Sequence, residues 1–467
     1  MTGPGDSGAL GEVLHRAADP ERYERWAAQA AGTGYCRHPI RLAGRLDAVD
    51  PVSGELAGLM DTAGEPDGVL LVACGNRRAT VCPSCAATYR ADAWQLVAAG
   101  LRGGKGVPAS VAAHPRVFVT LTAPSFGPVH SRREDRAGRG HRCRPRLGDL
   151  GSCRHGTPSV CEIQHDGHDP LLGQPICPAC FDYEAAVLFN CHVTALWQAT
   201  VLLTKRALAA RAGISTRQLA RRVRLAFGKV AEYQARGVVH LHAVARLDAA
   251  STDVPVVAAP EGITVADLIA ALTDAARVAS VALPSPKRGR LSWGTQFDIH
   301  PIPASRDETL HPIVETVAGY LAKYATKSTG AAGALDRPIR RAADIDTLEV
   351  NSHLRRMVAT CWRLGADPAY RHLRLRAWAH TLGFRGHLIT KSRRYSTTFT
   401  ALRTTRHDHA RARAHGPDFT TRESIGALRY TGRGYTTLGD AWLADTARAR
   451  RAEARQLARL DRYREPR

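Results

Sequence analysis

The chain has 467 residues, of which 44% are hydrophobic and 6% aromatic, and its formal net charge is +22. This length has room for two or three domains with a substantial core, and the charge indicates a polyanionic partner. No signal peptide begins the chain, and no apolar run approaches the roughly 20 residues that span a bilayer. We therefore expect a cytoplasmic protein without a membrane partner. Its 11 cysteines are then explained better as metal ligands than as disulfide partners.

A zinc-binding unit is predicted in the first domain, for which we expect residues 1–110. A Cys-Pro-x-Cys turn ends at Cys85, and the two sulfurs of such a turn point to one centre. One further cysteine follows a predicted helix over residues 9–31, and another follows a short apolar strand over residues 69–73. His38 is an alternative to the first of these. We predict one structural Zn²⁺ bound by Cys36, Cys74, Cys82 and Cys85.

A second cysteine-rich segment, residues 140–182, is inserted into the next predicted domain, residues 111–330. It follows a hydrophobic strand over residues 117–124 (VFVTLTAP) and contains a second Cys-Pro-x-Cys turn. Histidines lie nearby, so one of them is an alternative for any single ligand. We predict a second Zn²⁺ bound by Cys153, Cys161, Cys177 and Cys180, with Cys143, Cys191 and Cys361 as spare thiols.

The stretch GVVHLHAVARLD, residues 237–248, predicts the strand around which this domain is built. Its alternation places His240 and His242 on one face and Leu241 in the core. The preceding VAEYQ and the turn Ala-Arg-Gly predict a hairpin that brings Glu232 alongside His240. Two imidazoles and a carboxylate can bind one divalent cation. A pair of half-buried histidines on an ordinary strand is the alternative.

Several helices and one further strand are predicted around this hairpin. A long apolar helix over residues 183–212 and a basic helix over residues 214–223 precede it, and an amphipathic helix over residues 263–282 follows. A strand over residues 297–302 comes before a last helix over residues 312–328. This order favours an α+β fold, in which an antiparallel sheet carries helices on one face.

The helix over residues 312–328 carries Tyr320 and Tyr324 at i and i+4, on one face, with Lys323 beside them. A Thr-Leu-Thr strand, a His-hydrophobe-His strand and a Tyr-x-x-Lys-Tyr helix, in this order, resemble the HUH endonuclease superfamily over residues 116–329. Outside that range, the phrases CPSCAATYR and GFRGHLITKSRRYS resemble the rolling-circle replication initiators of actinobacterial plasmids, with the two-tyrosine motif.

This resemblance implies an origin-specific nickase and strand transferase with the HUH fold. Such enzymes cut single-stranded DNA at a divalent-metal site and keep the 5′ phosphate on a tyrosine. Carried over to this chain, Mg²⁺ or Mn²⁺ is held by His240, His242 and Glu232. Tyr324 is then the initiating nucleophile, Tyr320 acts at termination, and Lys323 supplies a positive charge near the phosphate.

A basic, mainly helical region is predicted for residues 331–467, with helices over residues 346–364, 367–382 and 436–464. Within it, a glycine-broken basic segment suits a DNA backbone, although a solvated loop explains it equally well. Its candidate DNA-binding residues are Arg385, Lys391, Arg393 and Arg394. The chain has no Walker A sequence, so helicase activity is expected from a host partner.

Three other functions are compatible with parts of this pattern. A two-tyrosine transposase also joins a cysteine-rich amino-terminal region to HUH and Tyr-x-x-x-Tyr motifs. A conjugative relaxase usually carries its tyrosine before the HUH motif, unlike this chain. A zinc-dependent DNA-binding regulator without chemistry has no need of two stacked tyrosines. We therefore expect a plasmid replication initiator that binds and nicks its double-strand origin.

Overall fold

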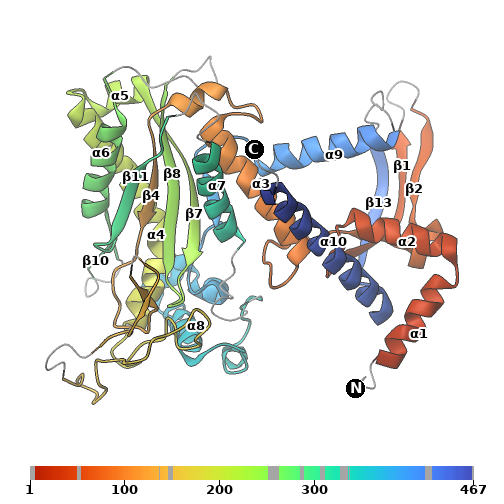
Figure 1. Ribbon diagram of the computed structural model, residues 1–467, viewed down its shortest axis with the longest axis horizontal. Coiled ribbons are helices and arrows are strands. Elements are labelled where there is room, and N and C mark those ends of the chain that lie inside the picture. Colours follow the sequence, from red (N-terminus) through yellow and green to blue (C-terminus); the bar gives the residue numbers. More distant parts are fainter. Residues whose placement is uncertain are drawn as a thin grey trace. The chain divides into compact units, whose positions relative to one another are not determined.

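The computed structural model describes residues 6–49, 54–135, 137–145, 151–250, 262–283, 289–304, 311–326, 335, 337–415 and 423–464. The chain divides into two compact units (Figure 1), one made of Met1–Ala91 with Thr400–Arg467 and the other of Asp92–Phe399. These boundaries differ from the expected ones after residues 110 and 330. The reason is that the C-terminal part of the chain returns to pair with the N-terminal part.

A four-stranded antiparallel sheet forms the first unit. Its central strand β1 (Ile40–Val49) pairs with β13 (Glu423–Arg433), β2 (Leu56–Asp61) and β3 (Leu70–Val72). Of these four strands, only β3 is predicted from the sequence. The mainly helical C-terminal region that was expected thus also contains a long strand, because β13 completes a sheet that begins near the N-terminus.

Helices flank this sheet. The helix predicted over residues 9–31 is two helices, α1 (Asp6–Ala17) and α2 (Pro20–Gly32). Proline cannot continue a helix, and the Asp19 side chain caps α2 by accepting a hydrogen bond from the Arg22 amide. Arg16 joins α1 to the C-terminal helix through Asp440, at 2.7 Å. The other helices here are α3 (Pro83–Arg102), α9 (Phe399–His415) and α10 (Leu438–Arg464), of which α3 and α9 cross the boundaries between the units.

The second unit contains a five-stranded antiparallel sheet with the strand order β11-β4-β8-β7-β12. The predicted hairpin is confirmed, because β7 and β8 pair along their whole length, from Val223 opposite Ala249 to Tyr233 opposite Val239. Gly237 closes the turn at a φ of 72°, which glycine adopts without strain. The strands are β4 (Arg116–Leu121), β7 (Val223–Tyr233), β8 (Val239–Ala249), β11 (Phe297–Pro301) and β12 (Ile389–Lys391).

The two faces of this sheet are covered by different helices (Figure 1). On one face, Leu241 and its neighbours pack into the main hydrophobic core with α4 (Tyr183–Arg211) and α6 (Val265–Val278). On the other face, α7 (His311–Ala325) lies against His242. The mixed helical and antiparallel architecture is confirmed, but the expectation of helices on one face is wrong. The tyrosine helix must face the histidines, which point away from the core.

Helix α4 is the core helix of this unit. By length and composition it is the one helix in the described part of the chain that could cross a membrane, although the sequence analysis identified no such run. Its apolar window is 61% buried within the structure. Buried Asn190 lies in its first third and accepts a hydrogen bond from the Val239 amide at 2.8 Å. The helix therefore positions one end of the β7–β8 hairpin.

The remaining elements are short. The helix predicted over residues 367–382 is two 3₁₀ segments, Pro368–Leu373 and Leu375–Thr381, because Arg374 between them has a φ of 50°. The other helices are α5 (Thr216–Arg222) and α8 (Ser352–Leu364), and the other strands are β5 (Arg133–Glu134), β6 (Gly140–His141), β9 (Ser280–Ala282) and β10 (Arg290–Ser292).

The cysteine-rich insert follows β4 and contains little regular structure. It begins earlier than expected, because residue Val129 already forms a bridge with Pro175 at its far end. The insert approaches the turn of the β7–β8 hairpin at Gly173, which has a φ of 80°. A Cβ atom added there would lie 2.2 Å from the Ala235 carbonyl carbon. Glycine is therefore needed where the insert touches the hairpin.

Candidate active site and metal centres

The hairpin brings the predicted histidines and glutamate together. Glu232 lies directly opposite His240 in the register of β7 and β8, and its Oε2 lies 3.0 Å from His242 Nε2. The two imidazole rings stack with their centroids 4.6 Å apart. His242 is buried. Three side chains with metal-binding atoms therefore share one patch of the sheet.

Each histidine is oriented by a further polar side chain. Thr120 Oγ1 lies 3.1 Å from His242 Nδ1, and Gln234 Nε2 lies 3.2 Å from His240 Nδ1. Among the described residues, His240 Nε2 is buried without a hydrogen-bond partner. Burial, together with the neighbouring His242, lowers the pKa of His240 to about 4. The imidazole is thus neutral near pH 7, which is the protonation state that a metal-binding histidine needs.

The two tyrosines of α7 cover this patch. The ring centroid of Tyr320 lies 5.0 Å and that of Tyr324 lies 5.4 Å from the centroid of His242. The two phenol rings are 4.6 Å apart. Phe118 packs against both His242 and Tyr320. Lys323 Nζ lies 5.8 Å from the centre of the Tyr324 ring. The histidine motif and the tyrosine motif, which lie about 80 residues apart in the sequence, are therefore in contact in the structure.

The environment of Tyr320 keeps its hydroxyl protonated. Burial raises the pKa of Tyr320, and the hydrogen bond with Tyr324 and the charge of Glu232 raise it further. A free phenol already has a pKa of about 10. The hydroxyl must lose its proton to act as a nucleophile. Attack from this side chain therefore needs a cation or a base beside it.

The hairpin trio differs from the other candidate metal centres. In the described residues, three groups of four have ligand atoms that all lie within 4.8 Å of one another, and all three contain cysteine. Among the described residues, Glu232, His240 and His242 do not form a fourth group of this kind, and Glu232 is hydrogen bonded directly to His242. A cation bound there would take the place of this hydrogen bond, and Glu232 and the two imidazoles are the side chains that would hold it.

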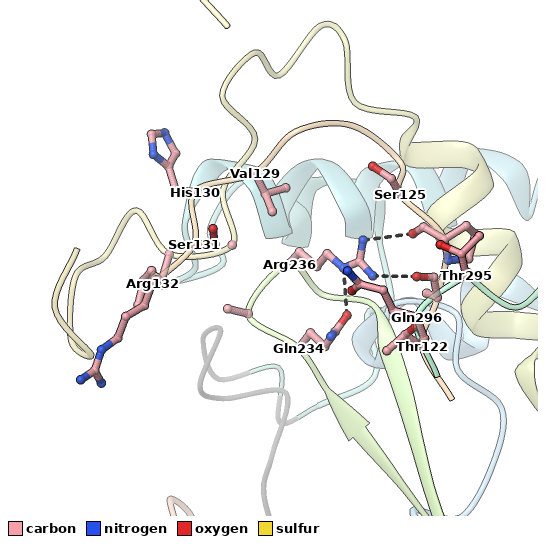
Figure 2. Close-up of a pocket in the computed structure, with 16 residues that line it drawn as sticks. Thr122, Ser125, Val129, His130, Ser131, Arg132, Gln234, Arg236, Thr295 and Gln296 are labelled. Carbon is pink, nitrogen blue, oxygen red and sulfur yellow. Dashed lines mark hydrogen bonds between the residues drawn. The ribbon is translucent and has the colours of Figure 1, made fainter. Parts of the chain in front are cut away.

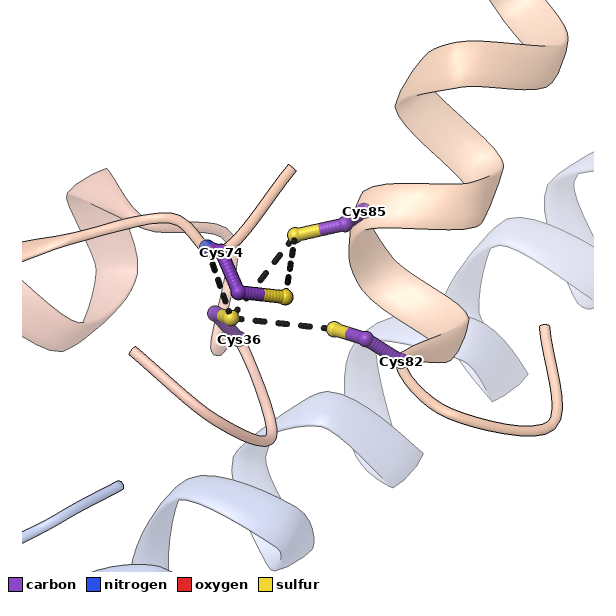
Figure 3. A group of neighbouring side chains, drawn as sticks. All are labelled: Cys36, Cys74, Cys82 and Cys85. Atoms are coloured by element: carbon purple, nitrogen blue, oxygen red, sulfur yellow. Dashed lines mark hydrogen bonds between the residues drawn. The ribbon is translucent and has the colours of Figure 1, made fainter. Parts of the chain in front are cut away.

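The first cysteine group contains the four residues predicted for it (Figure 3). The sulfur of Cys36 lies 3.7 Å from those of Cys82 and Cys85, and Cys74 Sγ lies 3.7 Å from Cys85 Sγ. These separations exclude disulfides, whose sulfurs are about 2.0 Å apart. Tetrahedral Zn²⁺ with bonds of about 2.3 Å holds its sulfurs about 3.8 Å apart. The donor set fits zinc, and His38 is not a member of the group.

The second predicted ligand set is not brought together as expected. Cys153, Cys177 and Cys180 lie together, but their fourth neighbour is His155 and not Cys161. His155 Nδ1 lies 3.2 Å from Cys180 Sγ and 3.8 Å from Cys177 Sγ. Cys161 is held elsewhere because its backbone pairs with Arg144, at 2.9 Å in both directions. A histidine substitution within the set was left open by the sequence, and it occurs.

Cys161 instead joins a third group with His130, Cys143 and His165. The sequence analysis left Cys143 as a spare thiol. The structure therefore contains three groups of four metal-ligating side chains in its described residues, not two. Cys191 and Cys361 lie outside all three groups.

The predicted DNA-binding residues lie in or near β12, an edge strand of the five-stranded sheet. Lys391 ends β12, whose residue Ile389 pairs with Val230 of β7. Arg385, Arg393 and Arg394 are exposed. Residues 389–391 of the segment thus form an edge strand. Burial lowers the pKa of Lys391, whose ammonium donates to the Arg393 carbonyl oxygen at 3.0 Å.

A pocket of about 630 Å³ lies beside the hairpin turn (Figure 2). Its walls come from the ends of β4 and β7, the start of β11 and the insert, including Thr122, His130, Gln234 and Gln296. Arg236 crosses it and donates to the carbonyl oxygens of residues 123 and 124 and to Gln234 Oε1. Gln234 also contacts His240, so the pocket adjoins the histidine site.

Sequence reasoning missed the side chains that orient the histidines. Thr120 and Phe118 alternate along β4 on the same face as His242, since Thr120 lies opposite His242 in the register. Gln234 is two residues after Glu232 and therefore on its face. The same period of two that identified the histidines would have identified these residues.

Comparison with known proteins agrees with this assembly of motifs. Residues 22–449 match the family described as "Replication initiator protein, pSAM2". The chain is 43% identical over 458 residues to a replication initiator protein of Streptomyces ambofaciens, covering 94% of this chain and 93% of that protein. No solved structure matches the chain. The chain belongs to the family of replication initiator proteins that the pSAM2 protein represents.

Proposed function

We propose that this replication initiator nicks one strand of a plasmid origin at the histidine hairpin, through an HUH-type active site. The observation that carries the proposal is the contact of both tyrosines with His242, on the face of the sheet that also holds Glu232. A purely DNA-binding protein has no use for this arrangement. Family membership favours replication over transposition.

In the proposed reaction, a tyrosine oxygen forms a bond to phosphorus while the bond from phosphorus to the 3′ oxygen breaks. The product is a 5′ phosphotyrosine and a free 3′ hydroxyl that can prime synthesis. His240, His242 and Glu232 would hold Mg²⁺ or Mn²⁺, which would neutralise charge on the phosphate. Thr120 and Gln234 fix the two rings.

Tyr324 is the proposed first nucleophile. Its ring stacks on His242 at an angle of 25°, and Lys323 is the cation closest to it on α7. The raised pKa of Tyr320 suits a residue that stays protonated during the first step. Tyr320 would then attack when the regenerated origin returns, and the released strand would close.

Two of the cysteine groups are proposed as structural zinc sites. They are Cys36, Cys74, Cys82 and Cys85, and the revised set Cys153, His155, Cys177 and Cys180. Four protein ligands leave no open position for chemistry, which is typical of structural sites. The net charge of +22 and the exposed arginines near β12 would bind the DNA backbone. Unwinding would come from a host helicase, and the protein would act in the cytosol.

The test is a covalent adduct. Purified protein is incubated with a single-stranded oligonucleotide that carries its plasmid's own origin, and the mixture is denatured and separated on a gel. We expect a protein–DNA band that survives denaturation in the wild type and in Tyr430→Phe, whose tyrosine is exposed in the first unit. Tyr324→Phe should lose most of it, and mass spectrometry should place the phosphate on the α7 peptide.

Binding of the oligonucleotide without any adduct, in the presence of Mg²⁺ or Mn²⁺, would contradict the proposal and leave a non-catalytic DNA-binding protein. An adduct mapped outside α7 would contradict the assignment of the tyrosines.

A further inference from the structure

The third group of ligands in the insert has the geometry of a metal site. His130 Nδ1 lies 3.1 Å from His165 Nε2, which lies 3.4 Å from Cys161 Sγ. Cys143 completes the group, and all four ligand atoms lie within 4.8 Å of one another. Tetrahedral Zn²⁺ with bonds of about 2.0 Å to nitrogen and about 2.3 Å to sulfur separates its ligand atoms by about 3.3–3.8 Å. The observed spacing is close to this range.

The surroundings of the group also fit a bound cation. Cys143, Cys161 and His165 are 2%, 7% and 3% exposed, which is unusual for loop residues without a core around them. Asp169 Oδ2 lies 2.5 Å from His165 Nδ1, so the carboxylate directs the other ring nitrogen toward the group. This carboxylate–histidine pair is the common support of metal-bound imidazole. The Ser131 amide donates to Cys143 Sγ at 3.2 Å, as it would to a thiolate.

We propose that His130, Cys143, Cys161 and His165 bind a third Zn²⁺, distinct from the two cysteine-rich zinc sites. Two thiolates and two imidazoles are a donor set typical of structural zinc. Zinc binding would release the thiol protons of Cys143 and Cys161 to solvent, and each thiolate and each neutral imidazole donates one lone pair. This inference does not depend on the nicking activity.

The position of this site gives it a structural task. The His130 amide donates to the Gln174 carbonyl oxygen at 2.8 Å, and the Gly173 amide donates to the His130 carbonyl oxygen at 2.9 Å. Gly173 in turn packs against Ala235 in the turn of the catalytic hairpin. His130 and Gly173 both line the pocket beside the histidines. The third zinc would therefore hold one wall of this pocket against the hairpin.

The test counts metal in the full-length protein. We expect three zinc equivalents per chain in the wild type and two in Cys143→Ser. Cys191→Ala, which removes a buried thiol outside the three groups, should keep three. His130→Cys replaces one ligand by another, so it should also keep three. When loaded with Co²⁺, it should show a stronger thiolate charge-transfer band than the wild type.

Hydrogen exchange gives a second readout. In Cys143→Ser, the amides of residues 129–132 and of residues 173, 174 and 176 should exchange faster, while those of β7 and β8 stay protected. Two zinc equivalents in both the wild type and Cys143→Ser would overturn the third site. If Cys143→Ser fails to fold, His130→Cys decides: a cobalt spectrum identical to that of the wild type overturns the proposal, and a stronger charge-transfer band supports it.

Discussion

The catalytic hairpin and the cysteine-rich insert hold their functional side chains by different means. In the hairpin, the backbone register of β7 and β8 alone places Glu232 opposite His240. In the insert, the backbone supplies only isolated bridges and two-residue strands, and the ligands converge from loops. A site on paired strands is formed before any ion binds. A site on loops needs the binding energy of the ion to offset the conformational entropy that the loops lose when they become ordered.

This difference decides what each ion can do. Glu232 and His242 already share a hydrogen bond at the hairpin, so we expect the sheet to stay folded when the proposed catalytic cation is absent. The insert contains eight potential ligands in two groups of four, on loops with little regular structure. We therefore expect loss of metal to unfold the insert and not the hairpin.

The largest effect should come from a substitution that breaks the catalytic site and spares the insert. His242→Ala removes one proposed ligand and the ring against which both tyrosines pack. Charge stabilisation by a metal ion contributes several kcal/mol, so adduct formation should fall by about 10³-fold or more. Zinc content and oligonucleotide binding should not change. His407→Ala, an exposed histidine on α9, is the control, and near-normal nicking by His242→Ala would refute the site.

The same comparison explains which parts of the protein are predictable from sequence. The alternation around His240 and the i, i+4 spacing of Tyr320 and Tyr324 are local patterns, and local patterns fix a strand face or a helix face. Ligand assignment in the insert is different. Cys161 and Cys153 are close in sequence, but backbone pairing with Arg144 holds Cys161 in a different group.

The first sheet was missed for a related reason. It pairs Ile40 with Arg433, and no short-range pattern reports a partner at that distance. Glycines occur where the backbones of β1 and β13 approach each other closely: a Cβ at Gly44 would lie 2.1 Å from the Ala427 carbonyl oxygen. Glycine in a strand weakens the alternation on which strand prediction depends.

The next effect concerns the turn of the hairpin, which is held by side chains and not by metal. Asn190 is fully buried, donates to the Gly237 and Leu382 carbonyl oxygens at 2.9 and 3.0 Å, and accepts from the Val239 amide. Asn190→Ala leaves these groups without their partner, so the free energy of unfolding should fall by about 3 kcal/mol. Chemical denaturation measures it.

A matched control is Asn351→Ala, which removes the cap of α8 and should cost only about 1 kcal/mol. Equal losses for the two variants would show that the turn does not depend on Asn190.

A smaller effect, with a defined pH dependence, concerns Lys229 on β7. Burial lowers the pKa of Lys229 to about 8, whereas a lysine in an unfolded chain has a pKa of about 10.4. Between these values the unfolded chain binds more protons, so stability rises with pH and is lowest below about pH 8. Lys229→Met should raise the free energy of unfolding by roughly 2 kcal/mol at pH 7 and flatten this rise. Lys205→Met, exposed on α4, should do neither, and an unchanged pH slope in Lys229→Met would contradict the assignment.

The smallest effect should separate the two tyrosines, which helix α7 places side by side. Their rings lie 4.6 Å apart, so either hydroxyl can reach the same phosphate with little movement, but only one can be linked to DNA at a time. Tyr320→Phe should therefore keep the first adduct while releasing roughly tenfold fewer closed single-stranded circles in a replication assay. Tyr324→Phe should lose the first adduct. If Tyr320→Phe releases as many circles as the wild type, one tyrosine performs both steps; if it loses the first adduct while Tyr324→Phe keeps it, the two roles are reversed.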